Sequence, residues 1–313
     1  YYIYNIMRTK KVAGLPIIPP NQESGSYTTP PNLPKMHQVC VAIGKRNSGK
    51  STAIINLIEK LGYDYTIAVS PTMKSNKELM TRLNIEHTFE NVDDPNVIDS
   101  IKKIVEDEAK DLERYQDELK RFNKLMTEIK KGEMVDDDLL LQFYNDDNFV
   151  KPEHRWNGNK PRIAVIFDDM MGSGMYSRPR KLNALSTYSR HVGQLEEGGS
   201  IGVSLFFMIQ SFKCQTGGLN KVIRNQCTTL LLFKSKDKKE LQDVAESVGG
   251  EIDEEMFYKV YNEAMGDGTG YPFLFIDLHK KKEHPSGFRR RLDTFIMPDE
   301  IEVKKNIETD DHN

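Results

Sequence analysis

Residues 39–51 read Val-Cys-Val-Ala-Ile-Gly-Lys-Arg-Asn-Ser-Gly-Lys-Ser, and this stretch decides the fold class. Its first five residues are apolar, which predicts a short buried strand at Val39–Ile43. Residues Thr52–Leu61 carry apolar side chains at helical spacing, so a helix is expected there. The intervening Gly44–Ser51 fits the pattern G-x-x-x-x-G-K-[ST], and it stands between a strand and a helix as that pattern requires.

The spacing of this loop suits a phosphate group. Glycines let the backbone bend so that successive N–H groups point inward, and the helix that follows presents its positive end. Lys50 supplies a charge to the β- and γ-phosphates, and the Ser51 hydroxyl is expected to bind Mg²⁺. A structural glycine turn is the alternative. The residues predicted to bind ATP are Gly44, Lys45, Arg46, Asn47, Ser48, Gly49, Lys50, Ser51 and Thr52.

A P-loop needs an acidic element at the end of a neighbouring buried strand. Ile163–Phe167 is a continuous apolar run, and Asp168 and Asp169 follow it directly. We predict that Asp168 holds the Mg²⁺ shell and that Asp169 orients or deprotonates the attacking water. Most motors of this kind carry Glu in the second position, and Asp is one methylene shorter. The alternative is a pair of loop aspartates that cap the next segment.

Gln210 follows another predicted core strand, Val203–Ile209. We predict that its amide senses the γ-phosphate or the water; a solvent-facing glutamine at a strand end is the alternative. The chain between Lys50 and Asp168 is long enough for an intervening strand, Tyr65–Val69. This arrangement separates additional-strand motor ATPases from P-loop kinases, in which the two motifs lie on adjacent strands.

The composition of the whole chain excludes several classes of protein. The 313 residues carry 44 Lys and Arg against 47 Asp and Glu, a formal net charge of −3, so the chain is not one that binds nucleic acid by bulk charge alone. Its apolar runs are too short for a membrane span. Three cysteines without C-x-x-C spacing argue against a disulfide framework and a zinc site.

Three parts are expected along the chain. Residues 1–35 are rich in proline and predict an extended arm or linker. Residues 36–300 form the P-loop ATPase domain, which a helical and acidic insertion at about 97–160 interrupts. Residues 301–313 form a polar C-terminal tail.

The insertion begins with one long amphipathic helix at residues 97–131, where apolar positions fall 3 or 4 apart. Packing of this helix on its own domain is favoured over a lever or a partner-binding coiled coil. Residues 136–159 are loop-like. Further helices are predicted at Leu79–Leu83, Ser235–Val248 and Asp253–Met265, and a further strand at Leu230–Phe233.

Near the C-terminus, Phe273–Leu278 and Leu292–Ile296 predict a hairpin at the sheet edge. Elsewhere strands alternate with helices. This order predicts an α/β fold of the additional-strand P-loop class, with a mainly parallel sheet and helices on both faces.

Five short motifs follow one another along the chain: Gly44–Ser51, Ser70-Pro71-Thr72, Ile166-Phe167-Asp168-Asp169, Ser189-Arg190-His191 ahead of the strand that ends in Gln210, and Ile223-Arg224-Asn225 ahead of Leu230–Phe233. In this order they resemble the genome-packaging ATPases of large DNA viruses and virophages, poxvirus-type relatives of the FtsK/HerA translocases. The resemblance covers residues 38–280. It implies a RecA-like core, ATP hydrolysis, a homo-oligomeric ring of five or six subunits, and transport of double-stranded DNA into a preformed capsid.

The resemblance also implies partners and a location. The partners are double-stranded DNA, further copies of the same chain, and a protein of the capsid vertex or portal. No basic-then-apolar leader is visible after Tyr1. We therefore expect the protein in the host cell cytoplasm or viral factory, associated with the assembling virion and not secreted.

Rings of the family complete each ATP site with an arginine from the neighbouring subunit, which stabilises charge on the γ-phosphate. By the resemblance this arginine is Arg190, in a match to the family's Gly-Arg-His signature that has Ser189 in place of Gly. Gly193–Gly199 makes a longer connection than the family pattern. Arg224 is the second candidate, and a surface salt bridge is the alternative for either.

Clusters of basic residues are candidates for contacts with DNA phosphates. The predicted contacts are Arg178, Arg180, Lys181, Arg289, Arg290 and Arg291, with Lys280–Lys282 as a neighbouring cluster. Arg178–Lys181 is favoured because a loop beside the hydrolysis site can move with each ATP cycle. A solvated charged face is the alternative for each cluster.

Two other functions fit the P-loop. One is a P-loop kinase or GTPase, although the chain has no N-K-x-D guanine signature. The other is a nucleotide-binding structural subunit, in which ATP only stabilises an assembly. ATP hydrolysis that disappears in Asp169→Asn would exclude this second alternative.

Overall fold

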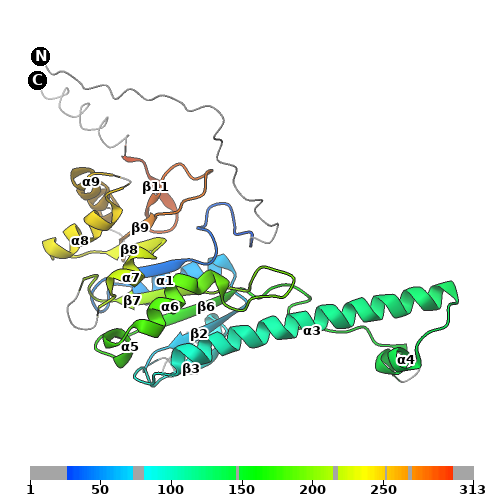
Figure 1. Cartoon of the computed structure of the whole chain (residues 1–313). Helices are drawn as coiled ribbons and strands as arrows, with labels where there is room; N and C mark the ends of the chain where they lie inside the picture. The colour runs from blue at the N-terminus through cyan, green and yellow to red at the C-terminus, as the bar shows by residue number, and fades with distance from the viewer. Residues whose placement is uncertain are drawn as a thin grey trace, which may run out of the picture.

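The computed structural model describes residues 27–72, 81–145, 148–213, 218–250, 252–266 and 270–298. Within these ranges the chain builds a nine-stranded sheet of order β11-β10-β9-β8-β1-β7-β6-β2-β3 (Figure 1). The strands are β1 (Val39–Ile43), β2 (Tyr65–Val69), β3 (Ile85–Phe89), β6 (Ile163–Asp168), β7 (Ser204–Ile209), β8 (Thr229–Phe233), β9 (Phe273–Asp277), β10 (Phe288–Arg290) and β11 (Thr294–Ile296). The six strands from β8 to β3 in this order are mutually parallel, and β9, β10 and β11 continue the sheet in antiparallel fashion. The predicted α/β fold with a mainly parallel sheet is confirmed.

Helices cover both faces of the sheet. They are α1 (Lys50–Leu61), α3 (Val97–Lys131), α4 (Asp137–Phe143), α5 (Gly174–Ser177), α6 (Arg180–Tyr188), the 3₁₀ turn η2 (Ser189–His191), α7 (Lys221–Asn225), α8 (Lys238–Val248) and α9 (Glu254–Met265). In β1, Val39 and Val41 belong to a buried cluster with α3, α6, α8 and α9, whereas Cys40 and Ala42 belong to a second cluster with α1. Burial on both faces is why the strand has no polar residue.

The order of the central strands determines where the functional loops meet. β7 lies between β1 and β6, and it pairs in parallel with both. This is the additional-strand order that the sequence predicts. However, the strand that intervenes is not Tyr65–Val69, which forms β2 on the far side of β6. The carboxyl ends of β1, β7 and β6 therefore lie side by side at one edge of the sheet.

The predicted helix at residues 97–131 is present as α3, which runs well beyond the sheet (Figure 1). Its first half is packed on the domain, where Ile101, Val105 and Leu112 are fully buried. Farther along, the ring of Phe122 packs edge-on against Phe143 of α4, with centroids 5.5 Å apart. No helix in the described ranges has both the length and the apolar character needed to cross a lipid bilayer.

The sequence predicts that the acidic stretch after α3 is a loop. In the structure, part of this stretch is regular. It contains α4 and a small hairpin of β4 (Tyr144–Asn145) and β5 (Asn148–Phe149). The Asp136 side chain accepts a hydrogen bond from the backbone N–H of Asp138, which caps the start of α4. Acidic residues in the first turn also complement the helix dipole. The run of aspartates is thus the start of a helix.

The C-terminal strands differ from the predicted two-stranded hairpin. β9 and β11 do not pair with each other, because β10 lies between them and pairs with both. β10 contains Arg289, which is only 2% exposed. A buried arginine in the middle of a three-residue strand has the wrong polarity for a sequence-based strand prediction.

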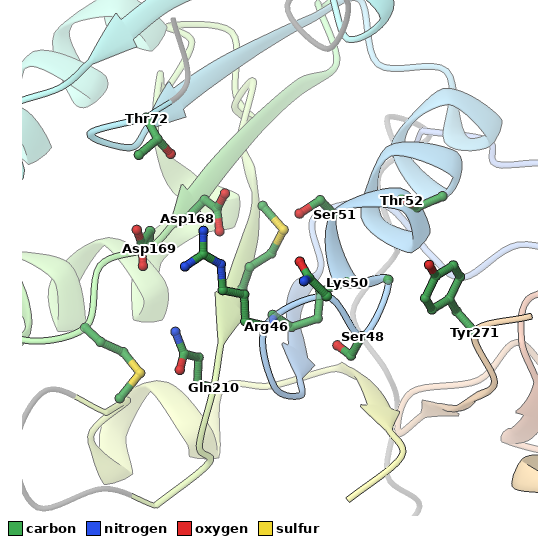
Figure 2. Close-up of a pocket in the computed structure, with 14 residues that line it drawn as sticks. Arg46, Ser48, Lys50, Ser51, Thr52, Thr72, Asp168, Asp169, Gln210 and Tyr271 are labelled. Atoms are coloured by element: carbon green, nitrogen blue, oxygen red, sulfur yellow. The ribbon is translucent and has the colours of Figure 1, made fainter. Parts of the chain in front are cut away.

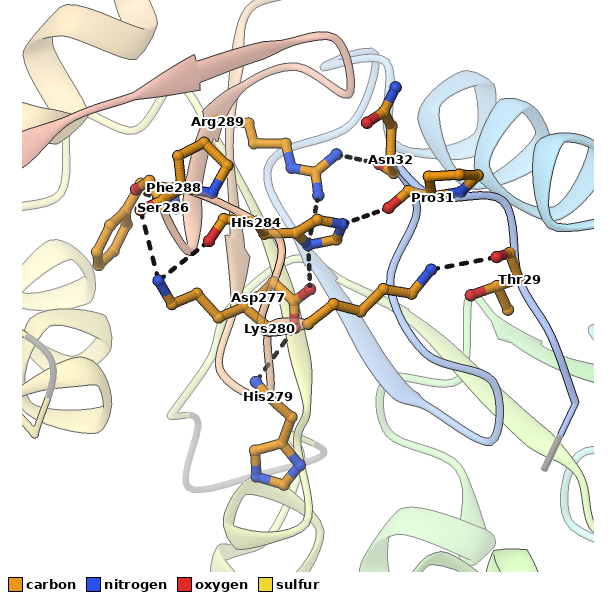
Figure 3. Close-up of polar contacts among 12 residues, drawn as sticks. Thr29, Pro31, Asn32, Asp277, His279, Lys280, His284, Ser286, Phe288 and Arg289 are labelled. Carbon is orange, nitrogen blue, oxygen red and sulfur yellow. Dashed lines mark hydrogen bonds and ion pairs between the residues drawn. The ribbon is translucent and has the colours of Figure 1, made fainter. Parts of the chain in front are cut away.

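The loop between β9 and β10 holds the described end of the predicted arm, residues 27–35 (Figure 3). Lys281 donates to the carbonyls of Thr29 and Pro30, and His284 Nε2 lies 2.6 Å from the Pro31 carbonyl oxygen. Arg289 donates to the Asn32 carbonyl. Four successive main-chain carbonyls are thereby satisfied by cationic or imidazole side chains. Residues 1–26 of the arm, the tail at 301–313 and part of the helix predicted at Leu79–Leu83 lie outside the described residues.

We expect Arg289→Ala to lower the free energy of unfolding by about 3 kcal/mol, because a buried side chain is removed and the Asn32 carbonyl loses a charged hydrogen-bond donor. The measurement is chemical denaturation followed by circular dichroism. Arg178→Ala is the control, since Arg178 is exposed, and it should leave the unfolding midpoint unchanged. Equal midpoints for the two variants would show that Arg289 does not stabilise the arm contact.

Candidate nucleotide site

The loop at Gly44–Ser51 curves around the N-terminus of α1 (Figure 2). A Cβ atom added at Gly44 would lie 2.7 Å from Ser48 Oγ and 2.8 Å from Phe233 Cβ, so no larger residue fits there without a shift. Gly49 has a φ of +94°, a left-handed conformation that favours glycine. The two glycines of the motif are therefore required by the shape of the loop.

Lys50 is the first residue of α1, and its side chain folds back over the loop. Its Nζ atom donates to the carbonyl oxygens of Gly44 at 2.6 Å and Lys45 at 2.8 Å. Partial burial lowers the pKa of Lys50, and the charges of Asp168 and Asp169 oppose that shift. In the same loop, Ser48 Oγ is buried without a hydrogen-bond partner among the described residues. A buried hydroxyl without a partner is costly, and this one lies against Gly44 and not on the accessible surface of the loop.

The acidic pair lies at the end of β6, across the cavity from α1: Asp168 is the last residue of the strand and Asp169 follows it (Figure 2). Burial raises the pKa of Asp168, and the neighbouring charge of Asp169 adds to that effect. Asp169 has a φ of +54°, which is uncommon for a residue other than glycine. Such conformations are frequent at functional sites, where surrounding structure fixes them.

One cavity of about 830 Å³ joins these elements. Its lining includes every residue that the sequence predicts around the phosphates, apart from Gly44 and Lys45. The lining residues are Arg46, Asn47, Ser48, Gly49, Lys50, Ser51, Thr52, Thr72, Asp168, Asp169, Met171, Met208, Gln210 and Tyr271. Figure 2 shows the guanidinium of Arg46 turned toward the two aspartates. The loop, the acidic pair and the glutamine thus come together as the parallel order of β1, β7 and β6 requires.

The oxygen donors in this cavity suit Mg²⁺. Ser51 and Asp168 both line it, and hydroxyl and carboxylate oxygens are the ligands that this hard cation prefers. The described residues contain no cluster of three or more His, Cys, Asp or Glu that could hold a metal by themselves. Mg²⁺ often binds through one or two protein oxygens together with substrate phosphates, and the residues present fit that mode.

Arg190 lies away from this cavity. It is an exposed residue of η2, and the backbone N–H of Val203 donates to the carbonyl of Ser189 just before β7 begins. Arg190 lines a different cavity, of about 160 Å³, together with residues that precede β1 and β8. It therefore lies at the opposite edge of the parallel strands, and within one chain it does not reach the P-loop.

Arg224 is held inside its own chain. Its guanidinium donates to the carbonyl oxygens of Phe212 at 3.3 Å and Leu219 at 2.7 Å. It also lies 5.6 Å from the centroid of the Phe212 ring. These contacts show that Arg224 holds the segment after β7 to α7 within one chain.

The predicted DNA-contacting residues are in different environments. Arg178 and Arg180 are exposed beside α5 and α6. Lys181 is also exposed, but it pairs with Asp99 at 2.5 Å. Arg290 pairs with Glu263 at 2.6 Å.

In the C-terminal cluster Arg289 is buried and Arg291 is half-buried. Burial of Arg289 contradicts its prediction as a DNA contact, because its guanidinium is committed to the arm. Arg291 follows β10 and lines a hollow beside α1, together with Tyr271. Of the six predicted contacts, only Arg178, Arg180 and Lys181 are exposed; in the neighbouring cluster Lys280 and Lys282 are exposed as well.

Tyr271 lines the nucleotide cavity, although nothing in the sequence predicts it there. It lies just before β9, far along the chain from the P-loop. Because β9 is antiparallel to β8, β9 starts at the edge where the parallel strands end. Only that topology places Tyr271 next to Gly49, and no sequence pattern around it indicates a ligand.

Comparisons with known proteins give only structural resemblances. No protein-family model matches the chain, and no curated protein does. The genome packaging NTPase B204 of Sulfolobus turreted icosahedral virus 2, solved with ATPγS, is 13% identical, with a TM-score of 0.40 over 82% of this chain and 98% of that one. The DNA-packaging ATPase B204 of Sulfolobus turreted icosahedral virus is 13% identical, with a TM-score of 0.45 over 82% and 97%.

A third structure, the pCW3 conjugation coupling protein TcpA with ATPγS, is 17% identical with a TM-score of 0.40. The match covers 86% of this chain and 65% of TcpA. The identities and TM-scores are low throughout, so what these proteins do is not transferred to this chain. The strand order and the loop of the chain itself are those of an additional-strand P-loop NTPase.

Proposed function

We propose that the protein hydrolyses ATP and uses the energy to move double-stranded DNA into a viral capsid, as one subunit of a homo-oligomeric ring. The observation that carries the ATPase part is the convergence of three strand ends on one cavity. β1 leads into Lys50 and Ser51, β6 ends in Asp168, and Gln210 follows β7. A phosphate loop, a metal-binding carboxylate and a polar sensor are the parts that phosphoryl transfer to water needs.

Each residue of the cavity has a separate task in this proposal. Backbone N–H groups of the loop and the Lys50 ammonium hold the phosphates, and the Ser51 hydroxyl and Asp168 carboxylate would hold Mg²⁺. When bound, Mg²⁺ neutralises charge that develops on the β- and γ-phosphate oxygens. Asp169 orients the attacking water and accepts its proton. Gln210 contacts the γ-phosphate or the water, and so reports hydrolysis to β7.

The strand order supports a motor over a kinase. In a P-loop kinase the strands that carry the loop and the acidic element are neighbours, whereas β7 separates them here. The order of motifs along residues 38–280, which resembles the packaging ATPases, supports DNA as the cargo. It also supports the predicted capsid vertex or portal protein as the partner of the ring.

The position of Arg190 supports a ring. An exposed arginine at the edge opposite the P-loop has no task in its own site. In a head-to-tail ring, the P-loop edge of one subunit faces a different surface of the next. Arg190 supplied in this way would stabilise charge on the γ-phosphate of the neighbour.

DNA contact is proposed for Arg178 and Arg180. They are exposed, and they follow the acidic pair by about ten residues in a segment that includes the short helix α5. A movement of the acidic loop during hydrolysis would reach them directly. They would bind phosphates by displacing counterions, without reading base sequence.

The proposal predicts that long duplex DNA raises the steady-state rate of ATP hydrolysis, and that the increase shrinks as salt concentration rises. In the double variant Arg178→Ala/Arg180→Ala, we expect the basal rate to persist and the DNA-dependent increase to be lost. Lys238→Ala/Lys239→Ala is the control, because both lysines are exposed at the start of α8. The measurement is phosphate release with and without DNA.

Each failure of this assay has its own meaning. ATP hydrolysis that ignores DNA at every salt concentration would contradict the motor. ATP binding without hydrolysis would favour the nucleotide-binding structural subunit. An unchanged DNA response in the Arg178→Ala/Arg180→Ala variant would exclude these two arginines as the contact.

A further inference from the structure

Tyr271 is an exposed aromatic residue that packs on the phosphate loop. Its side chain is 64% exposed. A Cβ atom added at Gly49 would lie 2.8 Å from Tyr271 Cβ and 3.0 Å from Cγ, so the tyrosine touches the loop where the chain enters α1. The tyrosine is therefore held against the loop and stays accessible to a ligand that the loop binds.

A second hollow, of about 370 Å³, continues from this contact. Gly49, Thr52 and Tyr271 line both this hollow and the larger cavity over the loop, so the two are adjacent. Beyond Tyr271, the side chains of Phe273 and Leu292 give the hollow an apolar wall. Sites for flat organic ligands combine such walls with a few polar groups.

The large cavity has two chemically different ends (Figure 2). Asp168, Asp169 and Gln210 lie on one side of the loop, and Tyr271 lies on the other, beyond Thr52. The end with the carboxylates is the end at which a terminal phosphate is cleaved in the proposed function. A nucleotide that lies along the loop with its last phosphate there has its base at the end where Tyr271 is.

We infer that Tyr271 is the stacking platform for the base of the bound nucleotide, and that the apolar hollow beside α1 receives that base. The inference rests on the proposed function, which places the phosphates. It adds the residue that distinguishes a nucleoside triphosphate from a bare polyphosphate. A tyrosine ring offers a rigid flat face for stacking at little cost in conformational entropy.

The test compares two ligands by calorimetry in the presence of Mg²⁺: ATPγS, which has a base, and inorganic tripolyphosphate, which has none. Tyr271→Ala should bind ATPγS about tenfold more weakly, the loss typical of one stacked base, and should bind tripolyphosphate as the wild type does. Tyr271→Phe keeps the ring and should match the wild type for both ligands. Tyr188→Ala is the control, since Tyr188 on α6 is 62% exposed and lines neither cavity.

The outcomes distinguish a failure of the role inferred for Tyr271 from a failure of the proposed function. Equal weakening of both ligands in Tyr271→Ala would overturn the inference, because Tyr271 would then act by shaping the loop through Gly49. Unchanged affinity for both ligands would overturn it as well. If the wild type binds neither ligand, the proposed function fails and the inference fails with it.

Discussion

Lys50→Ala should reduce steady-state ATP hydrolysis by about 10²- to 10³-fold, the loss expected when a charged group that stabilises the transition state is removed. Lys50 is the cation at the first position of α1, and its Nζ lies within 2.8 Å of two loop carbonyls. A nucleotide replaces those carbonyls with phosphate oxygens, which bind the ammonium more strongly because they are charged. The measurement is phosphate release at saturating ATP.

The control for this variant is Lys103→Ala on α3. Lys103 is exposed and lines neither the nucleotide cavity nor the hollow beside α1. It should leave the rate of hydrolysis unchanged. A folded Lys50→Ala protein that hydrolyses ATP at the wild-type rate would show that the loop is a structural turn.

Arg190→Ala should also reduce hydrolysis, by about 10³-fold, the low end of the effect of an arginine supplied by a neighbouring subunit. The unusual part of this prediction is complementation. Because Arg190 lies at the edge of the sheet opposite Lys50, each inactive variant keeps the half that the other lacks. A mixture of Lys50→Ala and Arg190→Ala proteins should therefore regain activity at interfaces that combine an intact loop with an intact arginine.

Arg224→Ala is the matched comparison in the same experiment. Its hydrogen bonds to Phe212 and Leu219 are made within one chain, so we expect reduced stability and no gain of activity on mixing with Lys50→Ala. Recovery with Arg224→Ala in place of Arg190→Ala would transfer the trans-acting role to Arg224. Absence of recovery with either, in proteins that are folded and assembled, would contradict an arginine supplied between subunits.

The strands at the centre of the sheet are predictable because both of their faces are buried. β1 and β2 have the bounds that their apolar runs predict, and β6 extends by one residue to Asp168. The sequence does not predict β3, because its five residues are only partly buried and include Glu86 and His87. At the edge of a sheet, backbone pairing with β2 is enough to define a strand without an apolar pattern.

Long-range contacts explain the other errors. Arg289 looks like a surface residue in the sequence, since a run of three arginines is normally solvated. Its burial depends on the carbonyl of Asn32, which lies more than 250 positions earlier in the chain. The position of Tyr271 also depends on a long-range contact. It reaches Gly49 only because β9 pairs antiparallel with β8.

The nucleotide site also contains residues that local motifs predict and residues that only long-range contacts place. The loop and the acidic pair are recognisable locally, because each motif contains its own strand and turn. The parallel order of β1, β7 and β6 then brings them to one edge. The base platform and the environment of each arginine depend on segments that only the folded chain brings together.

The central claim is that Gly44–Ser51 holds a triphosphate whose terminal phosphate is cleaved beside Asp168 and Asp169. The most direct measurement is a crystal structure of the full chain grown with Mg²⁺ and ATPγS. We predict phosphate oxygens on the backbone N–H groups of the loop, with the thiophosphate next to the two aspartates. Nucleotide bound elsewhere with the loop empty, or both carboxylates turned away from the thiophosphate, would contradict the claim.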